Sequence, residues 1–209
     1  MKLKIFKNFL KSEHLQLINS LELTKIVNNY GIAIYHNKIT KDGEIKSELF
    51  DENFLKSMHD TYHPIAMEIL KELSPKKLNL YEYSEFHLVE TGKDFSFPIH
   101  DDIPNKLLSG VIYIRPENNL GTSFFKNKKG EGEEIVDWEV NKAVFFSREE
   151  KQSWHSYKGD GKSNRLTIVY NLMTNDINKV YLAEGKSNIL GRIRTFINPY
   201  LFRYFKFTI

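Results

Sequence analysis

RLTIVY, residues 165–170, is the stretch of this 209-residue chain that most clearly indicates its fold. β-branched and aromatic residues are enriched in strands, and this run is rich in both. Alternate side chains of a strand point to opposite faces of the sheet, so positions 165, 167 and 169 share one face. The run therefore predicts a strand that begins with the cation Arg165.

Other short strand-like segments precede this run. Residues 78–89 are rich in Tyr, Phe and Leu, and further candidates lie at 108–114, 122–126, 134–138 and 142–147. Turn-rich stretches such as 116–119 and 159–161 separate them. Many short strands without helices between them favour an antiparallel sandwich or barrel over a parallel βαβ sheet.

The N-terminal third has a helical pattern instead. Residues 12–30 are expected to form a helix with Ser12 as its N-cap. Residues 51–73 are expected to form a second helix that Pro75 ends, with a break or kink at Pro64. Its expected apolar stripe is Phe54, Leu55, Met58, Tyr62, Ile65, Ile69 and Leu70. The predicted fold class is mainly β, with N-terminal helices that support a β core.

Composition limits the classes of protein to consider. Hydrophobic residues make up 41% of the chain, which is a globular composition, and the formal net charge of +3 does not point to nucleic acid. The absence of cysteine excludes disulfides, Fe–S clusters and thiolate zinc sites. No run approaches ~18 uninterrupted apolar residues, so a spanning helix is not expected. We expect one soluble, cytoplasmic domain over residues 1–186.

A metal site is suggested by three residues. Positions i and i+2 of a strand share a face, so His100 and Asp102 can both point inward from a strand end. His155 follows 55 residues after His100 and is expected to come from a neighbouring strand. Two imidazoles and one carboxylate can fill one face of a metal ion, an arrangement that suits Fe(II) with open positions. The triplet alone is weak evidence; its order, spacing and strand-rich setting carry the prediction. Asp101 and Ser156 are candidates to orient the histidines.

Arg165 is a candidate anion site. A guanidinium that points into a sandwich requires an anionic partner, because an unpaired buried charge is costly. A carboxylate held by two hydrogen bonds is the natural partner. Thr167 on the same face and Tyr113 on another strand offer further hydroxyl groups. The alternative is that Arg165 lies at the surface of an edge strand.

Together, His100-x-Asp102, His155 and Arg165-x-Thr167 resemble the signature of the Fe(II)/2-oxoglutarate-dependent oxygenase superfamily, and most closely its prolyl-4-hydroxylase-like branch. The resemblance covers residues 78–174, about half of the chain. It implies a double-stranded β-helix, a cupin-like jelly roll, over these residues, with residues 1–77 as helical support. It also implies that His100, Asp102 and His155 ligate Fe(II) and are the catalytic centre. Arg165, with Thr167 and Tyr113, would then bind the cosubstrate 2-oxoglutarate, O₂ being the second cosubstrate.

The resemblance is incomplete and leaves alternatives open. The family's usual Gly-Gly-Glu pattern is replaced here by Leu120-Gly121-Thr122, which weakens any assignment to a subfamily. A cupin-type metal enzyme that does not use 2-oxoglutarate and a non-catalytic jelly-roll binding or scaffold module are the competing hypotheses. The expected reaction is hydroxylation of a small-molecule or peptidyl substrate. Lysine-rich loops, which include Lys106 and residues 126–129, leave an anionic substrate open. The oligomeric state is not readable.

Residues 187–209 form a basic, aromatic C-terminal segment without acidic residues. Such a segment can lie on an anionic membrane surface or contact a partner. A C-terminal helix that packs on the β core with its cations in water is the favoured alternative.

Overall fold

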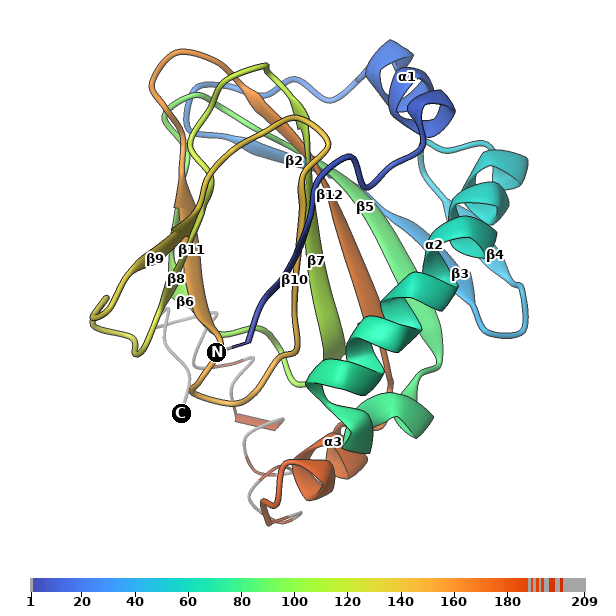
Figure 1. Cartoon of the computed structure of the whole chain (residues 1–209), viewed down its shortest axis with the longest axis vertical. Coiled ribbons are helices and arrows are strands. Elements are labelled where there is room, and N and C mark those ends of the chain that lie inside the picture. The colour runs from blue at the N-terminus through green and yellow to red at the C-terminus, as the bar shows by residue number, and fades with distance from the viewer. Residues whose placement is uncertain are drawn as a thin grey trace.

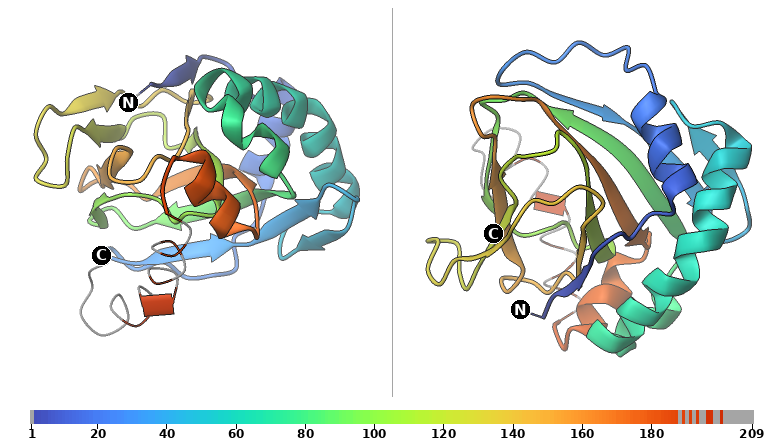
Figure 2. Two further views of the ribbon diagram at one scale, coloured as in Figure 1. Left: turned by 90° about the horizontal axis from the view of Figure 1, so that it is seen from below. Right: turned by 45° about the horizontal axis from the view of Figure 1, so that its top comes forward.

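Two antiparallel sheets face each other, and helices cover the outer side of the larger sheet (Figure 1, Figure 2). The structure is a computed structural model that describes residues 2–187 and, beyond them, residues 189, 191, 193, 196, 197 and 200. The predicted C-terminal segment 187–209 therefore lies largely outside the described residues. Among the described helices, none combines the length and the apolar character needed to cross a membrane.

The large sheet has eight strands in the order β1-β10-β7-β12-β5-β3-β4, with β2 also paired to β5. Their bounds are β1 Lys4–Phe6, β2 Ile32–Tyr35, β3 Asn37–Thr40, β4 Ile45–Ser47, β5 Tyr83–Thr91, β7 Lys106–Arg115, β10 Ala143–Phe146 and β12 Arg165–Met173. The small sheet has the order β6-β11-β8-β9, with bounds β6 Ser96–His100, β8 Thr122–Phe125, β9 Glu134–Val136 and β11 Trp154–Lys158.

The eight strands from β5 to β12 divide four and four between the two sheets. β5, β12, β7 and β10 are neighbours in the large sheet, and β6, β11, β8 and β9 make up the small one. All described pairings among them are antiparallel. This division is that of a jelly roll, which confirms the predicted fold class. β1 to β4, from the N-terminal part of the chain, extend the large sheet on both edges.

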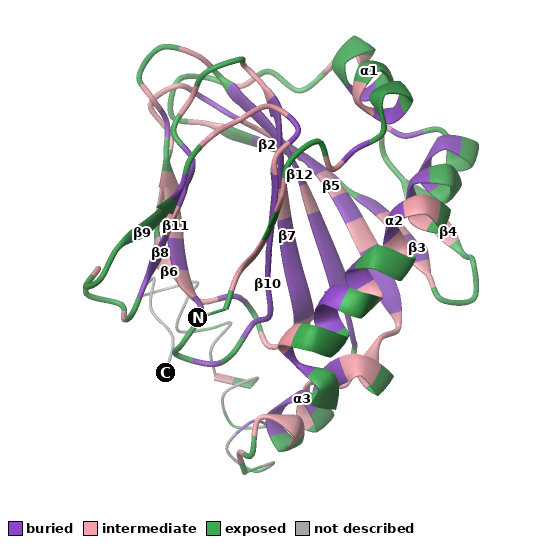
Figure 3. Ribbon diagram, in the orientation of Figure 1, coloured by how far each residue is buried: buried purple, intermediate pink, exposed green. Residues whose placement is uncertain are grey.

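The two faces of β12 serve different purposes. Leu166, Ile168, Tyr170 and Leu172 belong to the main apolar core between the large sheet and the helices. The alternate residues, which start at Arg165, face the small sheet. Figure 3 shows β7 and β12 largely buried between the helices and the small sheet. The interior between the sheets thus receives the polar face of this strand.

The helical layer differs from the sequence expectation in three ways. The helices are α1 (Ser12–Ser20), α2 (Glu52–Leu73) and α3 (Ile177–Ala183), with a 3₁₀ helix over Pro75–Leu80. The prediction of a helix over 12–30 was wrong beyond Ser20: Leu21 and Leu23 pack against the core, but from an extended chain. The pattern of apolar residues had correctly indicated burial without determining the backbone. Ser12 is not a cap; Lys11 occupies that position and makes no side-chain capping bond.

α2 is continuous through Pro64, so the predicted break is absent. Asp51 caps its N-terminus by accepting hydrogen bonds from the backbone N–H groups of Asn53 and Phe54. The buried stripe matches the prediction except at one step, because Ala66 is buried where Ile65 had been expected and Ile65 is 40% exposed. The stripe packs against the large sheet and so fixes the sheet that carries Arg165.

Candidate metal centre

The structure brings His100, Asp102 and His155 together at one end of the small sheet. His100 is the last residue of β6, and His155 on β11 is its direct partner in the sheet. Asp102 follows two residues after β6 ends. One ligand atom from each of the three lies within 4.8 Å of the others. Side chains that are distant in the sequence thus form one group, which we call the triad.

Each histidine has its tautomer fixed by a backbone carbonyl. His100 Nδ1 lies 3.0 Å from the Pro98 oxygen, and His155 Nδ1 lies 2.8 Å from the Ser153 oxygen. A carbonyl only accepts hydrogen bonds, so both Nδ1 atoms must carry the proton. The two Nε2 atoms therefore keep their lone pairs for a metal ion, as in many metal sites with oriented histidines.

The charges of the triad also suit a cation. Burial lowers the pKa of His100, and it lowers the pKa of His155 to about 4, so both rings are neutral at neutral pH. Burial alone would raise the pKa of Asp102, but the attraction of Lys106 and then of His155 and His100 outweighs it and lowers the pKa. Two neutral imidazoles and an ionised carboxylate are the forms that bind a divalent metal. The donor set therefore fits Fe(II).

Asp102 is held by two side chains of β7. Its Oδ1 accepts a hydrogen bond from Lys106 Nζ at 2.7 Å, and its Oδ2 accepts one from Ser109 Oγ at 2.6 Å. Each carboxylate oxygen has a second lone pair that stays available to a metal. The contacts with Lys106 and Ser109 therefore orient the carboxylate toward the histidines without using all of its acceptor capacity.

Asp101 acts on the loop before β11 and not on a histidine ring. It accepts hydrogen bonds from Ser153 Oγ and from the Lys151 backbone N–H, the latter at 2.7 Å. Ser153 in turn offers the carbonyl that orients His155. The candidate role of Asp101 is therefore indirect, through the loop, and no contact of Ser156 with either histidine ring is present among the described residues.

Arg165 is buried between the sheets. It is 3% exposed, and it opens β12 directly opposite Thr91 of β5. Its guanidinium carbon lies 4.1 Å from the centre of the Tyr157 ring, which is two residues from His155. Arg165 Nε has no hydrogen-bond partner, and no acidic residue among those described forms an ion pair with it. A buried cation next to the triad is thus without an anion.

The rings around Arg165 do not supply the missing charge. Burial raises the pKa of Tyr113, and it raises the pKa of Tyr157 to about 12, so both phenols are neutral. The rings of Tyr113 and Trp138 lie 5.5 and 5.3 Å from the guanidinium carbon. Sequence reasoning missed Tyr157 and Trp138. The position of Tyr157, two residues after His155 on the same strand face, was an available signal.

The two predicted helpers of Arg165 lie on the same interior face. Thr167 is the direct register partner of Tyr113 across β12 and β7, and both are buried. The Tyr113 hydroxyl lies 2.9 Å from Thr122 Oγ1 and accepts a hydrogen bond from the Thr122 backbone N–H at 3.1 Å. Tyr113 is therefore already bonded to β8, so its ring position is fixed beside the guanidinium.

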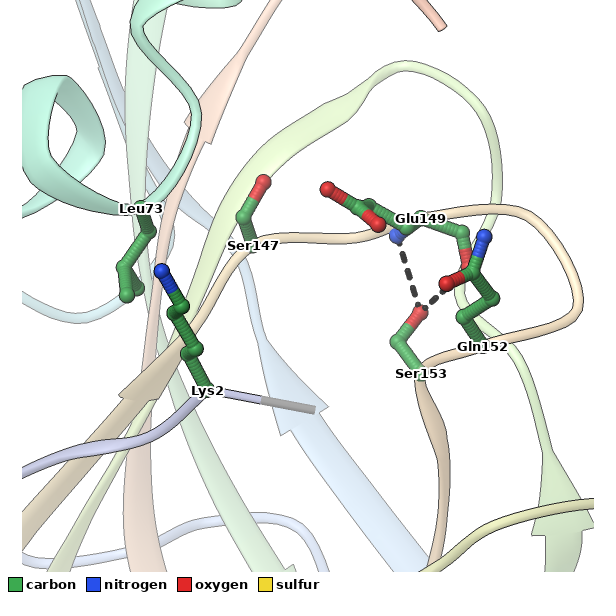
Figure 4. A pocket seen from close by; sticks show the side chains of 6 residues that line it. All are labelled: Lys2, Leu73, Ser147, Glu149, Gln152 and Ser153. Atoms are coloured by element: carbon green, nitrogen blue, oxygen red, sulfur yellow. Dashed lines mark hydrogen bonds between the residues drawn. The ribbon is translucent and has the colours of Figure 1, made fainter.

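A cavity of about 310 Å³ lies beside the loop before β11 (Figure 4). It is lined by Lys2, Leu73, Ser147, Glu149, Gln152 and Ser153. Figure 4 shows Ser153 Oγ bonded to Glu149 at the wall of this cavity. None of the triad residues lines it, so this cavity is not the candidate metal site.

Comparison with known proteins connects this fold to solved structures. No family model matches the chain, and no curated protein matches its sequence. A prolyl-4-hydroxylase from Pseudomonas putida superposes with a TM-score of 0.56 at 15% identity, over 83% of this chain and 92% of the other. An oxidoreductase of the 2OG-Fe(II) oxygenase family from Burkholderia pseudomallei superposes with a TM-score of 0.58 at 13% identity, over 82% and 85%.

A third structure is a prolyl hydroxylase from Trichoplax adhaerens in complex with a peptide fragment of the hypoxia inducible factor oxygen degradation domain. It superposes with a TM-score of 0.51 at 14% identity, over 84% of each chain. At such identities the likeness concerns the backbone. The chain therefore has the jelly-roll fold of the prolyl-4-hydroxylase and 2OG-Fe(II) oxygenase structures.

Proposed function

We propose that this chain is an Fe(II)- and 2-oxoglutarate-dependent oxygenase that hydroxylates a small-molecule or peptidyl substrate. The observation that carries the proposal is the buried, unpaired Arg165 beside a triad of neutral histidines and an ionised aspartate. The shared fold with 2OG-Fe(II) oxygenase structures supports it. The solved complex of a prolyl hydroxylase with a peptide supports a peptidyl substrate as one of the two classes.

In this proposal His100, Asp102 and His155 hold Fe(II). The bound iron would supply the O₂ chemistry that couples decarboxylation of 2-oxoglutarate to oxidation of the substrate. The protein's part is to present two Nε2 atoms and a carboxylate in fixed orientation, which the carbonyls of Pro98 and Ser153 support.

Arg165 would bind the distal carboxylate of 2-oxoglutarate. A guanidinium without an acidic partner gains most from a ligand that brings a carboxylate, because burial makes the unpaired charge costly. Thr167 adds a hydroxyl from the same strand face, and Tyr113, bonded to Thr122 on β8, lies beside the guanidinium. 2-Oxoglutarate would thus supply the carboxylate that the buried guanidinium of Arg165 requires.

Each of the two competing hypotheses leaves one feature of the site without a role. A cupin-type metal enzyme that does not use 2-oxoglutarate has no need of a buried cation beside the metal. A non-catalytic jelly-roll module has no need of two histidines whose tautomers both leave Nε2 free. The combination of both features in one chain favours the oxygenase.

The test begins with the purified protein under anaerobic conditions. Addition of Fe(II) and 2-oxoglutarate together should give a weak visible charge-transfer band, and calorimetry should show that 2-oxoglutarate binds only with metal present. Absence of both the band and the metal-dependent binding would eliminate the cosubstrate. In air, the wild type should form succinate even without added substrate.

Substitution of one ligand provides the second arm. His155→Ala should abolish succinate formation, because the triad then lacks one of its three donors. His59→Ala is the matched control, since His59 lies on α2, on the other side of the large sheet. Equal loss in both variants would show that the effect is on folding and not on the metal.

A further inference from the structure

A second group of polar side chains leads away from the triad along the inner face of the large sheet. Ser109 on β7, Asn171 on β12 and Glu85 on β5 are successive register partners. Ser109 donates to Asp102 at 2.6 Å, and Asn171 Nδ2 donates to Glu85 Oε2 at 3.1 Å. Neighbouring strands lie about 4.8 Å apart, so Glu85 is about 10 Å from Ser109. We call Glu85, His87 and Asn171 the polar strip.

The hydrogen bonds inside the polar strip leave two buried polar atoms without a partner. Glu85 only accepts, so Asn171 must turn its Nδ2 toward it, and His87, at 3.3 Å from Glu85, must carry its proton on Nε2. Asn171 Oδ1 and His87 Nδ1 then point away from Glu85, and both are buried without a hydrogen-bond partner. The amide oxygen of Asn171 only accepts, and buried acceptors are rarely left unfilled in folded proteins, so it indicates a missing donor.

The carboxylate of Glu85 is also without a permanent cation. Among the described residues no lysine or arginine forms an ion pair with it. Lys106 acts on it only at a distance, because its ammonium is bonded to Asp102 at 2.7 Å. Burial raises the pKa of Glu85, but the hydrogen bond and charge of His87 outweigh burial and lower it, so the group is ionised.

Arg165 and Glu85 thus carry opposite charges at separate points of the inner face: Arg165 opens β12, and Glu85 lies opposite Asn171, six residues further along that strand. Arg165 connects to the triad through Tyr157, which is two residues from His155, and Glu85 connects to it through Asn171 and Ser109. The side chains of Glu85 and His87 are each 17% exposed, so the strip is reachable from solvent. One end therefore suits an anion and the other a cation.

We propose that the polar strip binds a cationic nitrogen group of the substrate, an ammonium or a guanidinium, with Glu85 as its counter-charge. This inference rests on the proposed function, because it assigns the substrate class of the same site. An ammonium or guanidinium brings several N–H donors, which match the carboxylate of Glu85 and the open amide oxygen of Asn171. The carbon to be oxidised lies several bonds away from the nitrogen, toward the triad. Of the lysines that left an anionic substrate open, Lys106 is already paired with Asp102.

The test compares charged and neutral probes of equal shape on the wild-type protein. With Mn(II) and 2-oxoglutarate bound to prevent turnover, calorimetry is run with free lysine and arginine and with blocked tripeptides that contain them. The neutral counterparts contain norleucine and citrulline. In at least one pair the cationic probe should bind at least about tenfold more tightly, as expected for one charged hydrogen-bonded contact. Free amino acids and peptides separate a small-molecule source from a peptidyl one.

Two variants locate the effect. Glu85→Gln should remove the preference for the cationic probe while Mn(II) and 2-oxoglutarate still bind. Glu90→Gln is the matched control, because Glu90 lies on the same strand but faces away from the strip and contacts Asn164 at 3.2 Å. It should keep the preference. The comparison of probes on the wild type stands even where a variant does not fold.

The outcomes separate the two proposals. Wild-type protein that binds Mn(II) and 2-oxoglutarate but shows no preference for any cationic probe would overturn the role of the strip alone, as would an unchanged preference in Glu85→Gln. Protein that binds the cationic probes but neither Mn(II) nor 2-oxoglutarate would overturn the proposed oxygenase alone. Titrations without Mn(II) are included for that reason.

Discussion

Single atoms decide what the triad and its neighbour can bind. The Nδ1 protons of His100 and His155 are committed to carbonyls, and this leaves two Nε2 lone pairs beside one carboxylate. Arg165 Nε, whose guanidinium lies beside the Tyr157 ring, has no hydrogen-bond acceptor. The hydrogen bonds that these side chains already make therefore define the site, and the atoms left without a partner indicate which ligands it can bind.

Replacement of Arg165 tests directly whether its guanidinium binds 2-oxoglutarate. Arg165→Gln should raise the 2-oxoglutarate concentration needed for half-maximal succinate formation by at least about tenfold, because a desolvated charge contact is lost. Mn(II) affinity, measured by calorimetry, should stay as in the wild type, since Arg165 is not in the triad. Arg115→Gln is the control: Arg115 bonds the Asn19 backbone oxygen near α1. A rise in both variants, or a loss of Mn(II) binding in Arg165→Gln, would contradict the assignment.

Elements were predictable where their own residues determine them. α2 was readable from its apolar stripe, and β12 from its β-branched run; the Asp51 cap of α2 was not predicted. β11, WHSYK, has no such pattern and is a strand because β6 and β8 flank it. β1 to β4 are three- and four-residue strands, too short to give a periodicity.

The site likewise has a part that the sequence predicts and a part that it does not. The triad was readable because the spacing of His100 and Asp102 follows the two-residue period of a strand. The contacts that support it were not, because they join residues far apart in the sequence. Glu184 is 107 residues from Lys77 and 36 from Arg148, and no local pattern relates them. Asn171 and Glu85 meet only through the register of β12 and β5.

A buried ion-pair group ties the segment after α3 to the triad. Glu184 Oε1 lies 2.8 Å from both Lys77 Nζ and Arg148 Nη1, with side chains only 6%, 1% and 3% exposed. Arg148 Nε donates to the Asp102 backbone oxygen at 3.2 Å. The pKa of Glu184 is lowered, because Arg148 and then Lys77 outweigh the effect of burial. One carboxylate thus pairs with two buried cations, one of which holds the backbone of a triad residue.

Glu184→Ala should therefore cost stability and metal affinity together. Removal of one partner from a buried ion pair leaves an uncompensated charge, at a cost of about 3–5 kcal/mol in the free energy of unfolding. Urea unfolding measures this cost, and calorimetry should show weaker Mn(II) binding. Lys179→Ala is the control, because its ion pair with Asp176 lies in solvent, where such pairs contribute little to stability. Similar losses in the two variants would show that the group has no special role.

Burial lowers the pKa of five histidines on both sides of the large sheet. Burial lowers the pKa of His14 and His59 beneath the large sheet, of His63 beside them to about 4, and of His100 and His155 in the triad. In the unfolded chain these groups titrate near 6.5. Between the two values the unfolded state binds more protons than the folded state, so the free energy of unfolding falls as the pH falls. Above the unfolded value the full stability is present.

The metal-free protein should therefore lose stability well above the range in which carboxylates protonate. For His155, with a pKa of about 4 when folded and 6.5 when unfolded, the loss between about pH 7 and about pH 5 is about 2 kcal/mol. Urea unfolding in the presence of a chelator measures it. His155→Asn, whose amide can still donate to the Ser153 oxygen, should show a correspondingly smaller loss over the same interval. Bound metal should also reduce the loss at the upper end, because it holds the ring deprotonated until protons compete successfully for Nε2. Parallel curves for the wild type and His155→Asn without metal would mean that the buried ring does not control the acid response, and that the histidines beneath the large sheet do.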